Sequence, residues 1–370
     1  MTIDPGLESW LQLALAPGIG RSTFRRLLQQ FGLPQAILAQ PRAGLRTVLP
    51  PAAVAEIDSD GVRSAVARAL EWAAAPSHAI VTLADEGYPR ALLEIADPPP
   101  LLYVAGRSAL LNAPALAVVG SRNATAQGER NAESFARALS EAGLTITSGL
   151  ALGIDAAAHR GGLAGSSSTI AVLGTGIDIV YPRRNAELAA AIAARGALVS
   201  ELPLGTAPAA HNFPQRNRLI AGLSRGCLVV EAALASGSLI TARAAADQGR
   251  EVFAIPGSIH SPLSKGCHAL IKSGAKLVES ADDVLSELAG FVRPRAKAPG
   301  QAERASPGAS AESGLLAHMG HDPVDVDTLC SRARWSVEQV SSELLRLELD
   351  GRVTALPGGL YQRLERGTGR

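Results

Sequence analysis

The residues of this chain best suited to hold a ligand are glycines, serines and an arginine that follow short apolar runs. They form three groups, Gly120-Ser121-Arg122, Ser148-Gly149 and Gly174-Thr175-Gly176. In an open parallel sheet, ligands bind outside the carboxyl ends of the strands. Glycine lets an anion approach the main chain, successive N–H groups form a donor nest, and arginine can hold two phosphate oxygens. The pattern predicts an anion cradle at one sheet edge; the alternative is that the glycines only make tight turns.

Three further residues are expected at the same edge. Arg183 and Asn185 follow Tyr181-Pro182 and precede a helical segment, so they would extend the cradle beside a positive helix end. A solvated charged loop is the alternative for this segment. Lys265 also opens a helical segment and would add a cation to the rim.

Arg216, Asn217 and Arg218 stand just before an apolar helical run. The two arginines either reach phosphates or pair internally with acids such as Glu201 and Glu231. Internal pairing of at least one of them is favoured, because acids at strand ends commonly organise such sites.

No group of residues has the spacing of a catalytic or metal centre. Asp155 and His159 share one face of a predicted helix, but no nucleophile accompanies them, and structural roles are favoured. The chain has no Walker loop, no Gly-x-Ser-x-Gly, no His-Glu-x-x-His and no complete Gly-x-Gly-x-x-Gly. We therefore expect no catalytic residue, no metal and no cofactor.

The composition of the chain restricts the kind of site it can contain and the compartment in which it works. A formal net charge of +1 means that a polyanion site must come from local clusters of arginine and lysine. Three widely spaced cysteines argue against a disulfide framework and a thiolate metal site. The N-terminus lacks the basic residues of a signal peptide, and no apolar run is long enough to cross a bilayer. We expect a cytoplasmic protein without a membrane partner.

The elements that must position the cradle are those of an α/β fold with a Rossmann-like, mostly parallel sheet. Six apolar strand-like runs alternate with helical segments, which is typical of βαβ units. The runs are 116–120, 144–148, 169–173, 197–201, 227–231 and 251–255.

Accessory regions flank this core. Residues 1–88 are predicted to be helical, and Pro17-Gly18-Ile19-Gly20 between two helical patterns suggests a helix-hairpin-helix or an ordinary turn in a small bundle. Residues 89–292 would form the Rossmann-like domain, with proline-rich Pro89–Gly106 as an extended join. Residues 293–313 are expected to be a flexible linker, and 314–370 a winged-helix-like domain with two helices and a β-pair.

These motifs, in this order over about Pro89–Leu285, closely resemble the DNA-processing protein A (DprA/Smf) family. The motifs include Ser148 to Asp155, Arg216-Asn217-Arg218, Ser236 to Ala242 and Gly249 to Gly257. The resemblance implies a homodimeric, non-enzymatic protein that binds single-stranded DNA, protects incoming strands during natural transformation and helps load RecA recombinase onto them.

The resemblance also assigns phosphate contacts to Gly120, Ser121, Arg122 and Arg183. A lysine is common in the family at the position of Arg183. The arginine of this chain preserves the charge but alters the donor geometry. Aromatic residues, the usual stacking platforms for bases, make up only 4% of the chain. Tyr181 and Phe213 are the nearest candidates, although a core position is favoured for Phe213. The full set of candidate DNA-contacting residues is Gly120, Ser121, Arg122, Ser148, Gly149, Arg183, Asn185, Arg216, Asn217, Arg218 and Lys265.

Two other functions compete with this one. A nucleotide-processing enzyme resembling the lysine-decarboxylase-like phosphoribohydrolases would hold a mononucleotide phosphate in the same cradle, although their Pro-Gly-Gly-x-Gly-Thr loop is missing from the predicted sheet domain. Alternatively, the central domain is mainly a dimer scaffold, and DNA affinity lies in the hairpin and the C-terminal domain.

Overall fold

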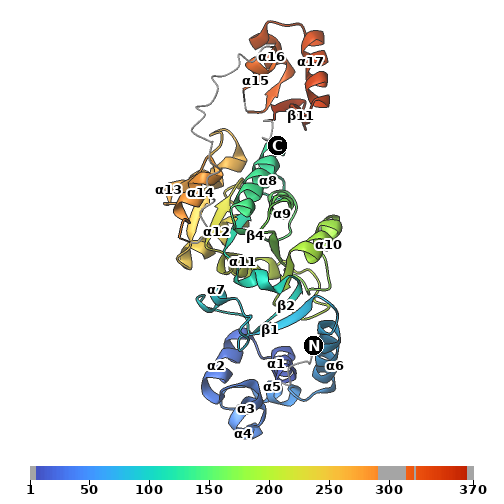
Figure 1. Cartoon of the computed structure of the whole chain (residues 1–370), viewed down its shortest axis with the longest axis vertical. Coiled ribbons are helices and arrows are strands. Elements are labelled where there is room, and N and C mark those ends of the chain that lie inside the picture. The colour runs from blue at the N-terminus through green and yellow to red at the C-terminus, as the bar shows by residue number, and fades with distance from the viewer. Residues whose placement is uncertain (1–5, 291–313, 321, 365–370) are drawn as a thin grey trace.

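The computed structural model of the chain describes residues 6–290, 314–320 and 322–364. Figure 1 shows three regions along the long axis: N-terminal helices, a central α/β region and a small C-terminal region. The expected linker over 293–313 lies outside the described residues.

The N-terminal region is a bundle of short helices. They are α1 (Leu7–Leu15), α2 (Arg21–Phe31), α3 (Pro34–Leu38), α4 (Arg42–Leu45), α5 (Pro51–Glu56) and α6 (Asp60–Ala73). The turn predicted at Pro17–Gly20 joins α1 to α2, and the helices pack through Trp10 and Phe24, whose ring centroids are 5.5 Å apart. Two helices joined by this turn are therefore confirmed, and the helix-hairpin-helix interpretation stays a prediction.

The central region is built on a nine-stranded sheet with the order β1-β2-β6-β5-β4-β3-β7-β8-β9. Its strands are β1 (His78–Thr82), β2 (Leu101–Gly106), β3 (Ala115–Val119), β4 (Thr145–Ser148), β5 (Thr169–Val172), β6 (Ala197–Ser200), β7 (Gly226–Val229), β8 (Glu251–Ala254) and β9 (Lys276–Leu277). Strand β2 runs antiparallel to β1 and β6, and the pairs from β6 to β9 are parallel. The six predicted strands and the α/β class are confirmed.

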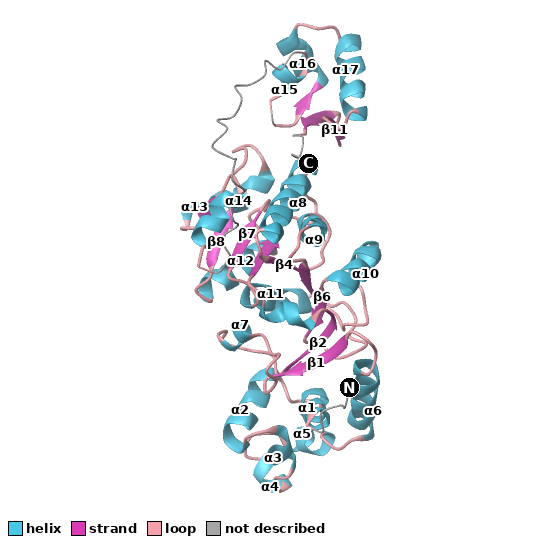
Figure 2. Cartoon of the chain, viewed as in Figure 1, coloured by secondary structure: helices cyan, strands magenta, loops and turns pink. Residues whose placement is uncertain are grey.

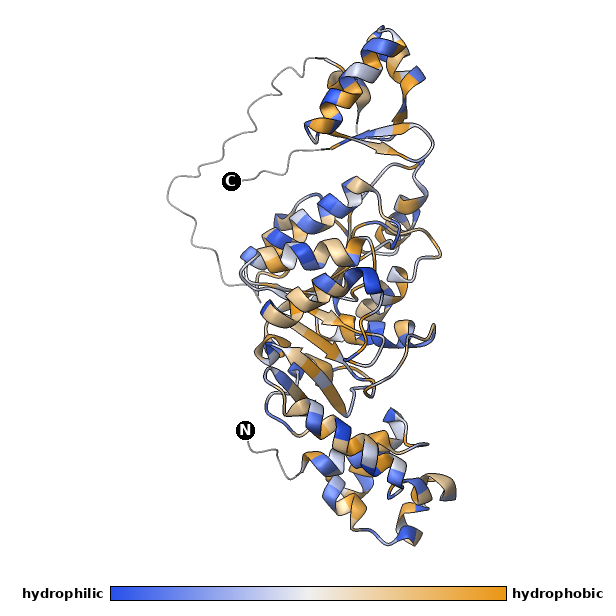
Figure 3. Cartoon of the chain, turned by 90° about the vertical axis from the view of Figure 1, so that its right-hand side faces the viewer, coloured by the Kyte–Doolittle hydropathy of each residue, from blue (hydrophilic) through white to orange (hydrophobic). Residues whose placement is uncertain are grey.

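Helices cover both faces of this sheet (Figure 2). They are α7 (Arg90–Leu93), α8 (Ala126–Glu141), α9 (Ile154–Ala164), α10 (Ala186–Arg195), α11 (Asn212–Gly222), α12 (Ser238–Asp247), α13 (Lys265–Lys272) and α14 (Ala281–Glu287). Leu116 and Val118 of β3 pack with α8 and α9, whereas Ala117 and Val119 pack with α11 and α12 on the other face. Because both faces are buried, the central strands are largely apolar, as Figure 3 shows in orange, although β4 has buried hydroxyl groups at Thr145, Thr147 and Ser148.

The prediction of an extended join over Pro89–Gly106 was wrong. This segment contains α7 and the buried strand β2, which is hydrogen-bonded to β1 and β6. Pro98-Pro99-Pro100 ends just before β2, where proline costs the sheet no hydrogen bond. The expected boundary after residue 88 also falls within this sheet region, because β1 precedes it and already belongs to the sheet.

The C-terminal region contains the predicted two helices and the predicted β-pair, together with a further helix and strand. The predicted elements are α16 (Val326–Ala333), α17 (Val337–Leu349), β11 (Val353–Leu356) and β12 (Leu360–Arg363), and the further ones are α15 (Leu316–Met319) and β10 (Val324–Asp325). The strands form a small antiparallel sheet in the order β10-β12-β11, and the region has its own apolar core. None of the helices described is both long enough and apolar enough for a membrane span.

Candidate nucleic-acid interface

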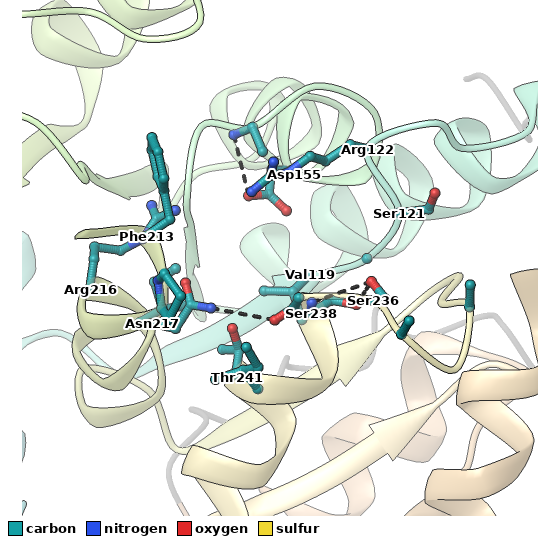
Figure 4. Close-up of a pocket in the computed structure, with 18 of the residues that line it drawn as sticks. Val119, Ser121, Arg122, Asp155, Phe213, Arg216, Asn217, Ser236, Ser238 and Thr241 are labelled. Carbon is teal, nitrogen blue, oxygen red and sulfur yellow. Dashed lines mark hydrogen bonds between the residues drawn. The ribbon is translucent and has the colours of Figure 1, made fainter. Parts of the chain in front are cut away.

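A cavity of about 770 Å³ opens at the carboxyl ends of β3 and β7 (Figure 4). After β3 the chain continues to β4 on one side, and it returns to the other side of β3 only with β7. This reversal leaves a crevice between the two connections, which is where open α/β sheets bind ligands. The cavity walls come from the loop after β3, the loop after β7, and helices α11 and α12.

The Gly120-Ser121-Arg122 turn lies in this wall, as predicted. A Cβ atom on Gly120 would lie 2.6 Å from Ile154 Cγ1, so the turn can approach α9 only because this residue is glycine. The Ser121 N–H donates to the Glu231 carbonyl over 2.7 Å, so it is not available to a ligand. Arg122 is exposed, and no carboxylate within the described ranges forms an ion pair with it.

Arg122 lies beside two aromatic rings. Its Cζ atom is 5.9 Å from the centre of the Phe213 ring, which is itself 5.6 Å from the Tyr181 ring. Tyr181 is 47% exposed and Phe213 half-buried, and both line the cavity. The favoured core position for Phe213 was therefore wrong, because the ring packs over the cavity wall and belongs to no apolar core cluster of the described chain.

Arg216 lines the cavity from below but is only 5% exposed. Its Nη1 donates to the Gly149 carbonyl over 2.8 Å and to the Val172 carbonyl. Burial lowers the Arg216 pKa to about 10, against the opposing charge of Asp155. The guanidinium group is thus fixed in place at the floor of the cavity.

The Ser148-Gly149 turn supports Arg216 and does not line the cavity. The Ser148 hydroxyl donates to the Val118 carbonyl over 2.6 Å. A Cβ atom on Gly149 would lie 2.4 Å from the Arg216 Nη1 atom, so glycine is required by the guanidinium group and not by a ligand. The Gly174-Thr175-Gly176 turn is likewise absent from the cavity wall, so only the first of the three predicted turns forms it.

Asp155 and His159 have the structural roles that were favoured. The Asp155 carboxylate accepts from the N–H groups of Gly149 and Ala151 over 3.1 and 3.3 Å. His159 Nε2 accepts from the Leu150 N–H over 3.3 Å, and Nδ1 lies 2.8 Å from the Thr169 hydroxyl. Burial raises the Asp155 pKa and lowers the His159 pKa to about 3. Both side chains shape the loop after β4.

Three other candidates lie away from the cavity wall. Arg183 and Lys265 are exposed, and neither lines the cavity. Asn185 is buried, and its amide donates to the Leu150 and Ala151 carbonyls over 2.8 and 3.1 Å. Asn185 therefore fixes the same loop as Asp155, while Arg183 remains available to solvent two residues from Tyr181.

Arg218 forms the internal ion pair that was favoured for one of the two arginines. It pairs with Glu201 and, at 3.8 Å, with Asp97, and Arg21 of α2 joins the same carboxylates. This cluster lies outside the cavity wall. Glu231 pairs with no arginine of the described residues: its carboxylate accepts from the Thr125 N–H and hydroxyl over 2.9 and 2.6 Å at the start of α8.

One wall of the cavity is formed by the start of α12, within the Ser236 to Ala242 motif. Helix α12 begins at Ser238, and the Ser236 hydroxyl lies 2.7 Å from the Ser238 hydroxyl. Asn217 reaches across from α11 to the Gly237 carbonyl over 3.4 Å, which places the predicted Asn217 in this wall with Thr241. The Ser-Gly-Ser sequence at the start of a helix was the signal that could have identified this wall.

The groups at this site can bind an anion but have no arrangement for metal binding. Over the part of the chain that is described, no three His, Cys, Asp or Glu side chains form a possible metal site. The cavity instead offers Arg122, the floor guanidinium of Arg216, hydroxyls at the start of α12 and the exposed face of Tyr181. This combination suits a phosphate group next to a planar base.

Comparisons with known proteins show the family of this chain. Residues 79–289 match the family model of DNA recombination-mediator protein A, and residues 297–359 match that of the DprA winged helix domain. Protein Smf of Escherichia coli is 46% identical over 312 residues, covering 82% of each chain.

Two solved structures are also similar. DNA processing protein A of Streptococcus pneumoniae superposes with a TM-score of 0.67 and 38% identity, covering 78% of this chain and 99% of that one. The same protein from Helicobacter pylori, whose structure was described for its single-stranded DNA binding mode, gives a TM-score of 0.53 at 30% identity, covering 58% of this chain and 97% of that one.

Proposed function

The chain belongs to the DNA recombination-mediator protein A (DprA/Smf) family, and from this membership we propose that it binds single-stranded DNA as a recombination mediator. The observation that carries the proposal is the exposed Arg122 guanidinium beside Phe213 and Tyr181, at an open cavity in the crevice of the sheet. The protein would act by binding the strand and not by changing it covalently.

Each part of the cavity supports one feature of a single strand. Arg122 would contact the backbone phosphate, and Arg183, which lies outside the cavity wall, would add a second cation near Tyr181. The ring face of Tyr181 would stack on a base, because every base has a π-face and stacking tolerates sequence variation. Arg216 would contribute positive potential from the floor, since its Nη1 is already committed to carbonyl groups.

Arg122→Ala tests this proposal. We expect the affinity for a labelled oligothymidylate to fall about tenfold, because an exposed phosphate contact and its cation–π support are lost. The slope of log K against log salt should also fall by about 0.7, the value for one phosphate of a single strand. Fluorescence anisotropy at several salt concentrations measures both quantities.

The matched control is Arg46→Ala, which removes an exposed arginine of the N-terminal helices and should leave both quantities unchanged. If Arg122→Ala binds the oligonucleotide as tightly and with the same salt slope as the natural protein, the cavity is not the DNA site.

The family resemblance extends the proposal to partners. Two copies would associate, and the DNA-bound protein would help load RecA recombinase onto strands taken up during natural transformation. Light scattering at micromolar concentration measures the first property, and the rate of RecA filament formation on a protein-coated single strand measures the second. A monomeric mass or an unchanged rate would contradict the corresponding part.

The rival nucleotide-processing function has less support. A hydrolase needs a free acid or base near the bound nucleotide, and the cavity carboxylate Asp155 already accepts two main-chain N–H groups. Pro357-Gly358-Gly359 lies in the turn between β11 and β12, in the C-terminal region. Release of free base from a nucleoside monophosphate by the purified protein would revive this alternative.

A further inference from the structure

Helix α17 presents an apolar strip to solvent. Val340, Leu344 and Leu347 pack into the small C-terminal core. On the outward side of the same helix, Val337, Leu345 and Leu349 are 56%, 59% and 81% exposed. Leu345 and Leu349 are four residues apart and therefore adjacent on the helix surface. The helix lies on the outer side of the C-terminal region in Figure 1.

The charged residues of this strip are acidic. Glu338 and Glu348 are exposed, and one carboxylate oxygen of Glu348 also accepts from the Ala355 N–H of β11 over 3.3 Å. Arg346 is the one basic residue of α17, and it pairs with Glu343 at 2.5 Å and with Asp350 at 3.4 Å. The outward face of α17 therefore has two carboxylates and no unpaired cation among its described side chains.

Exposed leucines and carboxylates do not suit a helix that binds in the major groove of DNA. In a helix-turn-helix arrangement the second helix, here α17 after α16, enters the major groove, and its surroundings contact phosphates through lysine and arginine. Residues 314–320 and 322–364 contain five arginines against seven aspartates and glutamates. A phosphate backbone brought against this face would meet like charge and exposed leucine.

We propose that the outward face of α17 is a docking site for a basic amphipathic segment of a partner protein. The partner would cover Leu345 and Leu349 with apolar side chains and pair its lysines or arginines with Glu338 and Glu348. A second copy of α17 fits less well, because each helix would bring its own carboxylates against those of the other. This site is separate from the cavity of the central region, so it does not depend on the proposed DNA binding.

A designed peptide pair tests the docking site on the full chain. One labelled peptide has helical Leu/Lys heptads, and the other has glutamate in place of every lysine. We expect the natural protein to bind the lysine peptide and not the glutamate peptide. Leu345→Ser with Leu349→Ser should weaken binding about tenfold, because the anchoring apolar contacts are lost. Glu338→Lys with Glu348→Lys should reverse the preference between the peptides.

Matched controls distinguish binding at this site from non-specific binding to other exposed residues. Leu93→Ser removes a leucine that is 55% exposed in α7, and Glu56→Lys changes an exposed acid in α5, and neither should alter peptide binding. All variants should keep circular dichroism spectra and single-strand affinity like those of the natural protein.

Three outcomes would overturn the proposal. The first is peptide binding that neither α17 double variant changes. The second is loss of duplex DNA binding in the leucine double variant, which would make α17 a DNA reader. The third is a lower molecular mass of that variant in light scattering, which would make the strip a contact between copies.

Discussion

The charged groups beneath the cavity, Arg216 and Asp155, are both buried, and each partly compensates the charge of the other. Arg216 Nη1 is bonded to carbonyl oxygens, its Nε has no partner within the described chain, and Asp155 is satisfied by main-chain N–H groups. His159 completes the set as a neutral ring, because a second cation beside Arg216 in a buried site would be costly. The stability of this buried set therefore depends on a ring that stays unprotonated.

This dependence predicts an acid-sensitive stability. The His159 pKa is about 3 in the folded protein and about 6.5 when the ring is solvated. A lowered folded pKa means that the unfolded chain binds the extra proton, so the stabilisation is complete above pH 6.5 and is lost as pH falls towards 3. For one such group, the free energy of unfolding falls by about 2 kcal/mol between pH 7.5 and pH 5. Asp155 and Glu231 have raised pKa values and act in the opposite direction.

Comparison with His159→Gln isolates this contribution. The variant should be less stable at pH 7.5 by about 1 to 3 kcal/mol, because buried hydrogen bonds are lost. Its free energy of unfolding should nevertheless depend less on pH, by the same 2 kcal/mol between pH 7.5 and pH 5. Urea unfolding at several pH values measures both, with His211→Gln, at an exposed position, as the control. Parallel pH profiles for the natural protein and the His159 variant would rule out a titrating role.

The sequence predicted some of these residues for a clear reason. Gly120-Ser121-Arg122 directly follows an apolar strand, so its place at the sheet edge follows from topology alone. The different roles of Arg216 and Arg218 could not be predicted. The two residues are two positions apart on α11, so the helix turns Arg216 beneath the cavity and Arg218 towards Glu201. That rotation depends on how α11 packs against the sheet.

At the scale of elements, the alternation of apolar runs and helices was enough to predict the parallel strands. Strands β1 and β2 were missed for a physical reason. They form the antiparallel end of the sheet, so only the short helix α7 lies between them, and Pro98-Pro99-Pro100 suppresses the strand signal immediately before β2. Their pairing brings the N-terminal helices against the sheet.

The ion cluster at this junction predicts how firmly the N-terminal helices are held. The Glu201 side chain is 6% exposed and bonds both Arg21 of α2 and Arg218 of α11. Glu201→Gln would leave two partly buried cations with only Asp97, so we expect a loss of about 1 to 3 kcal/mol. Hydrogen exchange should rise in α1 and α2 and stay unchanged in α8 and α9.

Glu8→Gln, at an exposed position of α1, serves as the control for this cluster and should leave exchange unchanged. An identical exchange pattern in the Glu201 variant and the natural protein would mean that apolar packing alone holds the junction.

At the scale of the whole molecule, the N-terminal helices share an apolar core with the sheet, whereas the C-terminal region has a core of its own. Trp10, Leu11 and Phe24 of the N-terminal helices belong to one cluster with Tyr103 and Leu198 of the sheet. The core of the C-terminal region shares no residue with the other clusters. The N-terminal helices are thus part of the structural support of the sheet, whereas the C-terminal region folds around its own side chains.

Truncations at the two ends should therefore behave differently. A chain that stops after residue 290 keeps every contact of the three larger clusters, so its main thermal transition, its affinity for oligothymidylate and its salt slope should match those of the full chain. A chain that begins at His78 exposes the Tyr103 side of the sheet to water, and its transition temperature should drop by several degrees, because about 1 kcal/mol shifts it by roughly 2 to 4 °C in a domain of this size. Calorimetry and anisotropy on both chains measure these quantities. Loss of single-strand binding in the chain ending at 290, with its thermal transition intact, would move the DNA site to the C-terminal region and leave the central cavity without the role proposed for it.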